Sequence, residues 1–166
     1  MAIALLLVLQ LNALTLRLAF IGAGLAATYP LLKRFFPIPQ LYLGLAFGWA
    51  VPMAFAAELG VVPRVGWVML LAAIAWAGVY DTFYAMADRP DDLRIGVKSS
   101  AITFGDMDLA MVGAMQLMVL VSLLFCGRLM RYGAPYYWGL AAGAALFAWQ
   151  QWLARGRDAA GCMRAF

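Results

Sequence analysis

The 166-residue chain contains no histidine and only two cysteines, Cys126 and Cys162. The lack of histidine excludes the common zinc sites, a histidine ligand to haem, and a Ser-His or Cys-His catalytic pair. Two cysteines so far apart in the sequence do not form a disulfide framework. If this chain performs chemistry, carboxylates and a hard cation are the expected agents.

Charge is also scarce. Only 12% of the residues are charged and 66% are hydrophobic, with a mean hydropathy of +0.87, whereas a soluble domain is about half apolar and a quarter charged. Such a chain has too little polar surface to face water, so a lipid bilayer is its expected solvent. The net charge of +4 comes from basic residues at the ends of apolar runs, where they orient membrane helices, and no nucleic-acid partner is expected.

Polar and proline-rich breaks divide the sequence into one partial and five full apolar helices. The partial run, residues 1–11, is about half of the ~20 residues that span hydrocarbon. The full runs are residues 13–32, 40–57, 65–87, 108–126 and 134–153. We therefore expect an all-α, polytopic transmembrane bundle forming a single domain over residues 1–166, incomplete at both ends, with a kink at Pro52.

Two pairs of glycines have the GxxxG spacing, Gly44 with Gly48 and Gly139 with Gly143. Because small residues let membrane helices approach closely, both pairs predict helix–helix contacts within the bundle. A substrate-facing role is the less favoured alternative.

Basic residues are unevenly divided between the two ends of the expected helices. Eight lie on the side that carries Lys33, Arg34 and the loops around residues 89–98 and 155–164, and four lie on the other side. The side richer in Lys and Arg faces the cytoplasm. The polar stretch 88–100, which we expect to be a loop, is therefore predicted to be cytoplasmic.

Half of the eight acidic residues lie in one stretch of the chain: Asp81, Asp88, Asp91 and Asp92. A helical turn would place Asp88 and Asp92 on one face, where two carboxylates suit a hard divalent cation shared with substrate phosphates. Arg94 and Lys98 are placed to neutralise the remaining charge of a diphosphate. The alternative is a solvated interfacial loop whose mixed charges merely end the helix.

Four further residues have both a functional and a structural interpretation. An ionisable group within an apolar span, such as Asp81, indicates function, unless a basic residue of another helix pairs with it. Lys33 and Arg34 anchor a helix end on the cytoplasmic side, or else line a diphosphate site on that face; the sequence favours the anchor. Tyr84 is either a core or lipid-facing ring, the commoner case, or a ring that stabilises a carbocation.

A longer pattern includes these residues: Tyr80-Asp81-Thr82-x-Tyr84-Ala85-Met86-x-Asp88-x-x-Asp91-Asp92-x-x-Ile95-Gly96-x-Lys98-Ser99. It resembles the second aspartate-rich motif of the 4-hydroxybenzoate polyprenyltransferases in the UbiA family. Shorter matches support the resemblance along essentially the whole chain: Tyr29-Pro30-x-x-Lys33-Arg34, Pro39-Gln40, Gly44 to Trp49, and Phe147 to Gln151.

The resemblance implies a UbiA-like bundle of about nine helices in the bacterial inner (plasma) membrane, around a cavity open to the cytoplasm. Two aspartate-rich motifs of such proteins hold Mg²⁺ on a polyprenyl diphosphate, and ionisation gives an allylic cation that the ring of 4-hydroxybenzoate attacks, in ubiquinone biosynthesis. Transferred to this sequence, it implies metal ligands Asp88, Asp91 and Asp92, catalytic residues Asp81 and Tyr84, and substrate-binding residues Lys33, Arg34, Arg94 and Lys98.

The sequence also departs from that family. Pro90 and Phe83 stand where relatives often carry an acidic and a polar residue. The first motif, of the form Asn-Asp-x-x-Asp-x-x-x-Asp, is missing, since the single asparagine, Asn12, precedes Ala13. We therefore expect a fragment that is inactive alone. The alternatives are a haem or menaquinone branch of the same superfamily, or a small membrane protein without enzymatic activity.

Overall fold

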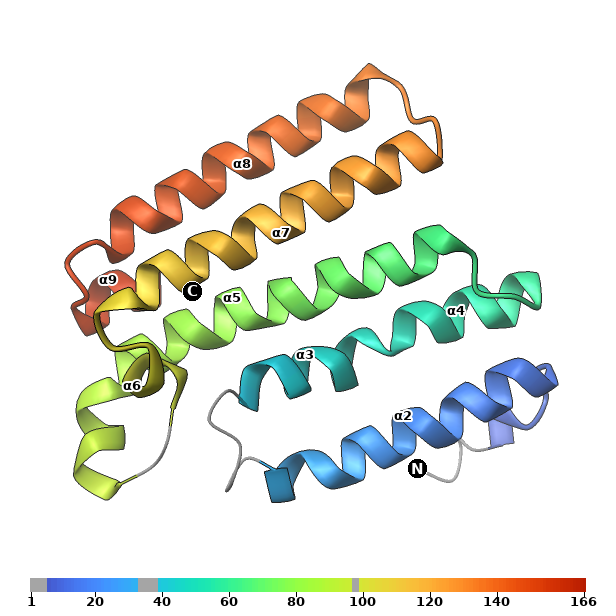
Figure 1. The fold of residues 1–166 in the computed structure, drawn as a ribbon, viewed down its shortest axis with the longest axis horizontal. Coiled ribbons are helices and arrows are strands. Elements are labelled where there is room, and N and C mark those ends of the chain that lie inside the picture. Colours follow the sequence, from blue (N-terminus) through green and yellow to red (C-terminus); the bar gives the residue numbers. More distant parts are fainter. Residues whose placement is uncertain (1–5, 33–38, 97–98) are drawn as a thin grey trace.

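The computed structural model describes residues 6–32, 39–96 and 99–166, and within these ranges the chain is helical with no strand. The elements follow in the order α2 (Ala13–Leu32), α3 (Pro39–Gly48), α4 (Ala50–Leu59), α5 (Arg64–Ile95), α6 (Ser100–Phe104), the 3₁₀ turn η1 (Gly105–Met107), α7 (Asp108–Leu129), α8 (Ala134–Ala154) and α9 (Ala159–Ala165). The long helices lie side by side in chain order, with α3 and α4 forming one broken rod (Figure 1). The expected all-α polytopic bundle is confirmed.

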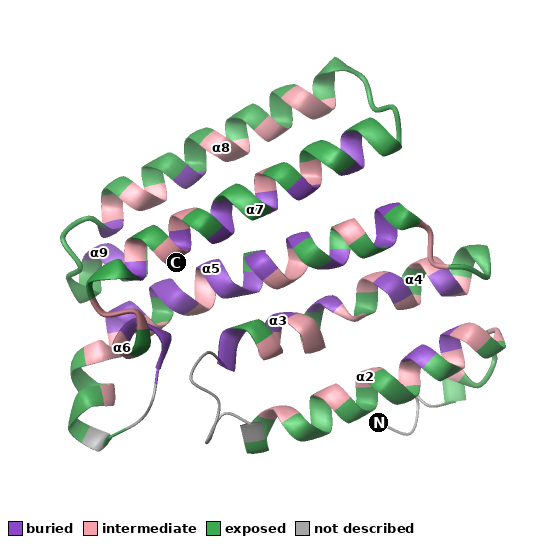
Figure 2. Cartoon of the chain, viewed as in Figure 1, coloured by how far each residue is buried: buried purple, intermediate pink, exposed green. Residues whose placement is uncertain are grey.

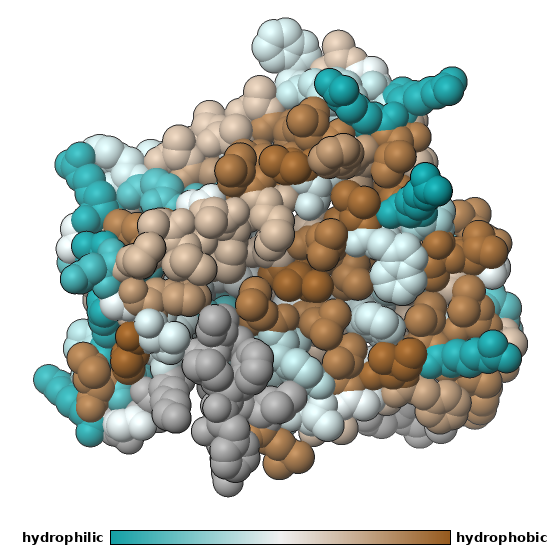
Figure 3. Space-filling view, in the orientation of Figure 1, coloured by the Kyte–Doolittle hydropathy of each residue, from teal (hydrophilic) through white to brown (hydrophobic). Residues whose placement is uncertain are grey.

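Four stretches of the described chain are long and apolar enough to cross a membrane: residues 13–31, 39–59, 64–94 and 100–129. Their apolar side chains form a broad band between two ends that carry the polar ones (Figure 3). Helix α8 has 21 residues but is not among the four, because its tyrosines, tryptophans and two glutamines lower its hydropathy. The chain is thus a multi-pass membrane protein.

Helix α5 is the centre of the bundle, packing against α3 on one side and α7 on the other. Buried positions concentrate on α5 and on the facing side of α7, whereas most of α8 is exposed (Figure 2). Phe83 on α5 and Val112 on α7 are both fully buried in the main hydrophobic cluster. The helix that carries the acidic motif is therefore the best-anchored element of the fold.

The predicted helix over residues 40–57 is two helices, because the rod breaks at Trp49. The Trp49 indole N–H donates to the carbonyl of Leu18 at 2.9 Å, which ties the break to α2. Pro52 lies in the first turn of α4 rather than in a helix interior, where its missing N–H costs least. The expected kink is present, three residues before the proline that predicted it.

One glycine pair makes the contact that its spacing predicts, and the other does not. Gly44 and Gly48 bring α3 onto α5: a Cβ at Gly44 would lie 2.7 Å from the carbonyl oxygen of Ile74, and one at Gly48 3.0 Å from the Cβ of Ala73. Gly139 and Gly143 on α8 have nothing within 4 Å of a Cβ position. Within the described chain, the prediction is right for the first pair and wrong for the second.

A network of glutamines joins α7 to α8, and nothing in the sequence pattern predicted it. The Gln116 amide donates to Gln150 at 3.0 Å and accepts from Gln151 at 2.9 Å. Gln150 also donates to the carbonyl of Ala165 at 2.8 Å, so the network reaches α9. In an apolar setting such side-chain amides are expected to bond to one another rather than stay unpaired.

Replacing Gln116 with leucine should weaken this contact, since it removes the two hydrogen bonds that Gln116 forms with α8. Interhelical hydrogen bonds in membranes contribute about 0.6 kcal/mol on average, so we expect Gln116→Leu to lower the free energy of unfolding by about 1 kcal/mol. Unfolding of the detergent-solubilised chain by SDS measures this change. Leu117→Ala, at an exposed neighbouring position, is the control, and an unfolding curve for Gln116→Leu that matches that of the wild type would contradict the assignment.

Candidate functional site

The acidic motif lies on a helix that extends to Ile95. Residues 88–95 are therefore not part of the loop predicted for residues 88–100. Helix α5 continues through Pro90 to Ile95 and ends at Gly96, which adopts the left-handed conformation with φ 71° and donates its N–H to the carbonyl of Asp92. Pro90 only removes the hydrogen bond that its own N–H would make four residues back. The physical reason for the extension is this C-terminal cap, since glycine accepts positive φ without strain.

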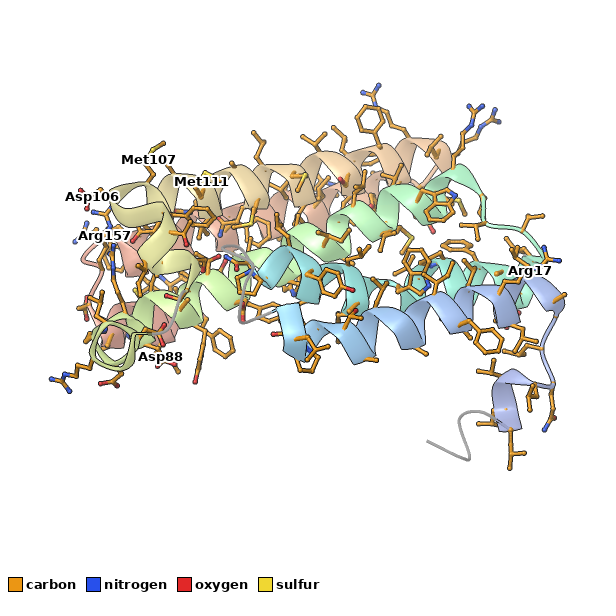
Figure 4. The ribbon with its side chains drawn as sticks, turned by 60° about the horizontal axis from the view of Figure 1, so that its bottom comes forward. Arg17, Asp88, Asp106, Met107, Met111 and Arg157 are labelled. Atoms are coloured by element: carbon orange, nitrogen blue, oxygen red, sulfur yellow. The ribbon has the colours of Figure 1, made fainter. Side chains whose placement is uncertain are left out.

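This helical conformation sets the arrangement of the three predicted metal ligands. Asp88, Asp91 and Asp92 are three and four residues apart, which places them on one face of α5. Asp88 and Asp92 are partly buried, and Asp91 is exposed. Asp88 lies at the end of the bundle that also carries Asp106 and Arg157, opposite the end with Arg17 (Figure 4).

Two of the predicted residues lie beside these acids. Tyr84 precedes Asp88 by one turn, on the same face of α5. Arg94 forms an exposed ion pair with Asp91, with 3.4 Å between Nη1 and Oδ1. The Tyr84 ring is 45% exposed and lies 5.7 Å from the ring of Phe166. Tyr84 is thus not a core residue, and the face of α5 that carries it is open.

Asp81 lies on α5, two turns further into the bundle than Asp88. Its neighbour on α5, Thr82, is fully buried and receives a hydrogen bond of 3.4 Å from Gln40, at the start of α3. Helices α3 and α5 therefore both bring polar groups to this level of the bundle. Lys33, Arg34 and Lys98 lie outside the described residues.

The sequence analysis missed Asp108, the first residue of α7, which is 0% exposed. Its Oδ1 accepts from Arg157 Nε at 2.9 Å and its Oδ2 from Arg89 Nη1 at 3.5 Å. The N–H of Leu109 also donates to Oδ1, at 2.7 Å. A buried carboxylate is tolerated when it is paired and hydrogen-bonded, and here two guanidinium groups and a backbone amide satisfy it.

One signal in the sequence could have identified Asp108. It begins an apolar span, and an acidic residue at a helix N-terminus interacts favourably with the helix dipole. Its partners could not be identified in that way, because Arg89 lies on α5 and Arg157 lies between α8 and α9. The pairing depends on tertiary packing over separations of 19 and 49 residues.

Arg157 is held in an unusual backbone conformation, with φ 52°. Its Nη2 donates to the backbone carbonyl of Asp106, in addition to the bond from Nε to Asp108. The hydrogen bond and the charge of Asp108 raise the pKa of Arg157 above its ordinary value. This guanidinium stays charged and ties the loop after α8 to the start of α7.

The donor set at this end suits a hard cation in part. Mg²⁺ in proteins is bound by one or two carboxylates together with substrate phosphates and water. Asp88 and Asp92 can supply the two carboxylates. Among the described residues, no group of three or more acidic, Cys or His side chains is close enough to hold a metal by itself. The Ser99 and Ser100 hydroxyls are buried with no partner among the described residues, so this end has further oxygen atoms available for bonding.

An apolar hollow of about 440 Å³ lies elsewhere, between α5, α7 and α8. Its lining includes Trp76, Tyr136, Phe147 and the open Gly139 face. Trp76 precedes Asp88 by twelve residues, or about 18 Å along a helix. The hollow is thus separate from the acidic end of the bundle.

A comparison with protein families matches residues 1–166 to the UbiA prenyltransferase family. A curated relative from Alkalilimnicola ehrlichii, named 4-hydroxybenzoate octaprenyltransferase, is 54% identical over 160 residues, which are 96% of this chain and 55% of the relative. Proteins of the same name from Aeromonas hydrophila and Vibrio atlanticus are 51% and 49% identical, over 96% and 99% of this chain and 56% and 58% of their own. The chain thus spans about half the length of the curated relatives it matches. No solved structure matches it.

Proposed function

Because the chain belongs to the UbiA prenyltransferase family, we propose that it forms the diphosphate-binding part of a 4-hydroxybenzoate polyprenyltransferase. The reaction is the Mg²⁺-dependent transfer of a polyprenyl group from polyprenyl diphosphate to 4-hydroxybenzoate, in ubiquinone biosynthesis. The observation that carries the proposal is the helical acidic face at the end of α5, where Asp88 and Asp92 lie one turn apart and Tyr84 lies one turn before Asp88. The names of the relatives support the acceptor and the reaction type.

Asp88 and Asp92, with Asp91 between them, are the residues that would hold Mg²⁺ against the diphosphate. Bound Mg²⁺ neutralises charge that develops on the departing diphosphate. Lys33, Arg34, Arg94 and Lys98 would add positive charge for the same anion. Cationic groups aimed at this developing charge act most strongly where the cavity excludes water.

The remaining site residues act on the acidic face and on the cation. Tyr84, one turn before Asp88 on the same face of α5, would donate its hydroxyl proton to a hydrogen bond with that carboxylate and fix its orientation. The electron-rich face of its ring is open and attracts positive charge, as aromatic rings do, so it would stabilise the allylic cation that forms when the C–O bond to diphosphate breaks. Asp81, deeper in the bundle, would act on the acceptor or on the cation through its negative charge.

The proposal places the acidic end of the bundle in the cytoplasm of a bacterial inner membrane. By the helix ends that carry them, four described arginines lie at the opposite end and five lie at the acidic end. Lys33, Arg34 and Lys98, outside the described residues, add three by sequence to the acidic end, which makes it the richer side.

The proposal differs from the haem and menaquinone alternatives in the acceptor of the prenyl group. The test is an exchange protein, namely the Alkalilimnicola ehrlichii relative in which the 160 matched residues are replaced by this chain. We expect it to prenylate 4-hydroxybenzoate and to use 1,4-dihydroxy-2-naphthoate, a menaquinone precursor, at less than about one hundredth of that kcat/KM, a ratio in the range that binding contacts can supply. A preference for the naphthoate would refute the assignment of the acceptor.

Alone in lipid nanodiscs, the 166-residue chain is expected to give no measurable prenyl transfer with Mg²⁺ and both substrates. The reason is that these 166 residues contain one of the two aspartate-rich motifs that the family resemblance implies, and half of a metal site stabilises little of the charge on the leaving group. Thin-layer chromatography with radiolabelled 4-hydroxybenzoate measures the product. Robust turnover by the isolated chain would show that its own acids suffice, and the exchange protein in the same nanodiscs is the positive control.

A further inference from the structure

We infer that Asp108 is a positioning residue that keeps Arg89 away from Asp88 and Asp92, and so keeps those carboxylates available for a divalent cation bound with a prenyl diphosphate. The inference rests on the proposed function, because it concerns the same acidic face. It assigns a role to a residue outside the aspartate-rich pattern. Its basis is a set of ion pairs at the end of the bundle.

Arg89 is the residue that could block a cation site on this face. It follows Asp88 directly and lies three residues before Asp92. Opposite charges three or four residues apart on a helix attract one another and pair readily. The same helix provides an example, because Asp91 and Arg94 have this spacing and pair at 3.4 Å on the exposed surface. Arg89 and Asp92 have the same three-residue spacing in the reverse order, which gives a weaker but still attractive interaction, so Arg89 can pair with Asp92 unless another acid holds it.

The structure shows a different pair. Arg89 is bonded to Asp108 on α7 through Nη1 and Oδ2 at 3.5 Å. Among the described residues, neither Asp88 nor Asp92 forms an ion pair with any basic side chain. The Arg89 guanidinium, which could neutralise Asp92, is thus held against Asp108 of the neighbouring helix α7.

Burial explains why Asp108 wins this competition. The Asp108 side chain is 0% exposed, while Arg89 is 29% exposed. An ionised carboxylate without a partner is far more costly in the interior than at the surface, where water screens charge. Asp92 is only partly buried, so it loses less when Arg89 pairs elsewhere. The burial of Asp108 therefore sets the direction in which Arg89 pairs.

The second partner of Asp108 makes the arrangement selective. Arg157 Nε bonds to Oδ1 at 2.9 Å and would keep Asp108 compensated if Arg89 were removed. Replacing Arg89 should therefore leave the buried carboxylate paired and the fold intact. Replacing Asp108 releases Arg89 next to Asp88 and Asp92. The two substitutions have opposite consequences for the acidic face, which separates positioning from a purely structural role.

The experiment measures binding of Mn²⁺, as a paramagnetic substitute for Mg²⁺, by electron paramagnetic resonance. The wild-type exchange protein and its variants are placed in nanodiscs with saturating farnesyl diphosphate, and only the folded fraction from size-exclusion chromatography is titrated. We expect Asp108→Asn to weaken Mn²⁺ binding at least about tenfold, the lower end of what residues behind a metal site contribute. Asp106→Asn, an exposed acid in the same segment, should leave the affinity unchanged.

The decisive part of the experiment is the restoration of Mn²⁺ affinity by a second substitution. The double variant Asp108→Asn/Arg89→Gln should bind Mn²⁺ within about threefold of the wild type, because the competing guanidinium is gone; coupling of this kind is what a double-mutant cycle measures. Arg89→Gln alone should also resemble the wild type. A loss for Asp108→Asn that the second substitution does not restore would show that Asp108 acts only through folding and would overturn the inference, as would an unaltered affinity in Asp108→Asn.

A wild-type exchange protein that binds no Mn²⁺ in the presence of farnesyl diphosphate would instead overturn the proposed function, and the inference with it. If Asp108→Asn does not fold, a structure of the wild-type exchange protein with Mn²⁺ and farnesyl diphosphate decides the question. The expected result is Arg89 on Asp108 and the cation on Asp88 and Asp92. An ion pair between Arg89 and Asp92 in that structure would overturn the inference.

Discussion

Asp92→Asn and Asp88→Asn are each expected to lower kcat for prenyl transfer by the exchange protein at least about a hundredfold. Asparagine keeps the size of aspartate but removes the charge that a hard cation requires. Loss of one group that stabilises developing charge lowers rates by about 10²–10³. The fold should be retained, because Asp88 and Asp92 are only partly buried and form no ion pair within the described chain. Product formation under saturating Mg²⁺ and both substrates measures the effect.

Two matched substitutions make this result specific to the acidic face. Asp106→Asn and Asp158→Asn remove carboxylates from the same end of the bundle at exposed positions, and Asp106→Asn is the better control because Asp158 caps α9. Both should leave kcat within about twofold of the unsubstituted exchange protein, as surface substitutions away from a site usually do. If Asp106→Asn lowered kcat as much as Asp92→Asn, a general loss of negative charge at this end would explain the result, and the assignment of the metal ligands would not stand.

Gly44→Ala is expected to be the most destabilising single methyl group that can be added between α3 and α5. A Cβ at this position would lie 2.7 Å from the carbonyl oxygen and 2.9 Å from the Cα of Ile74, and both are backbone atoms that cannot rotate away. The two helices must therefore separate. Overpacking of this kind costs about 1–3 kcal/mol, and we expect the upper half of that range. SDS-induced unfolding of the detergent-solubilised chain measures the loss.

Gly139→Ala is the matched control, with the same substitution in the other GxxxG pair. Nothing lies within 4 Å of a Cβ at Gly139, so no neighbour has to move. Alanine also favours a helix over glycine by about 1 kcal/mol, and the stability of Gly139→Ala should equal or exceed that of the wild type. Equal losses of stability for Gly44→Ala and Gly139→Ala would show that the close packing of α3 on α5 is not the reason for glycine at position 44.

Much of this fold was predictable from the sequence because it depends on local patterns. The apolar run at residues 13–32 has the bounds of α2, since a polar residue and a basic pair flank it. The extension of α5 to Ile95 does not follow from composition, because a polar stretch favours a loop. The later glycine in that stretch, Gly96, is the feature that ends the helix. Helix ends are set by caps rather than by hydropathy.

The candidate site was predictable only in the part that lies on one helix. The spacing of Asp88 and Asp92 is a local property, and the helical conformation preserves it. The pairs of Asp108 with Arg89 and Arg157 join three segments, and no periodicity in one segment specifies a partner in another. The glutamine network between α7 and α8 was missed for the same reason. The metal assignment stays a prediction, with its ligands now placed on one face of α5.

The central claim is that the acidic face at the end of α5 supports a metal-dependent transfer of a prenyl group to 4-hydroxybenzoate. The most direct measurement is prenyl transfer by the exchange protein in nanodiscs before and after chelation with EDTA. The account predicts turnover that EDTA abolishes and that Mg²⁺ in excess of the chelator restores, with no restoration in Asp92→Asn. Turnover that persists in EDTA, or a folded exchange protein without turnover in Mg²⁺, would contradict it.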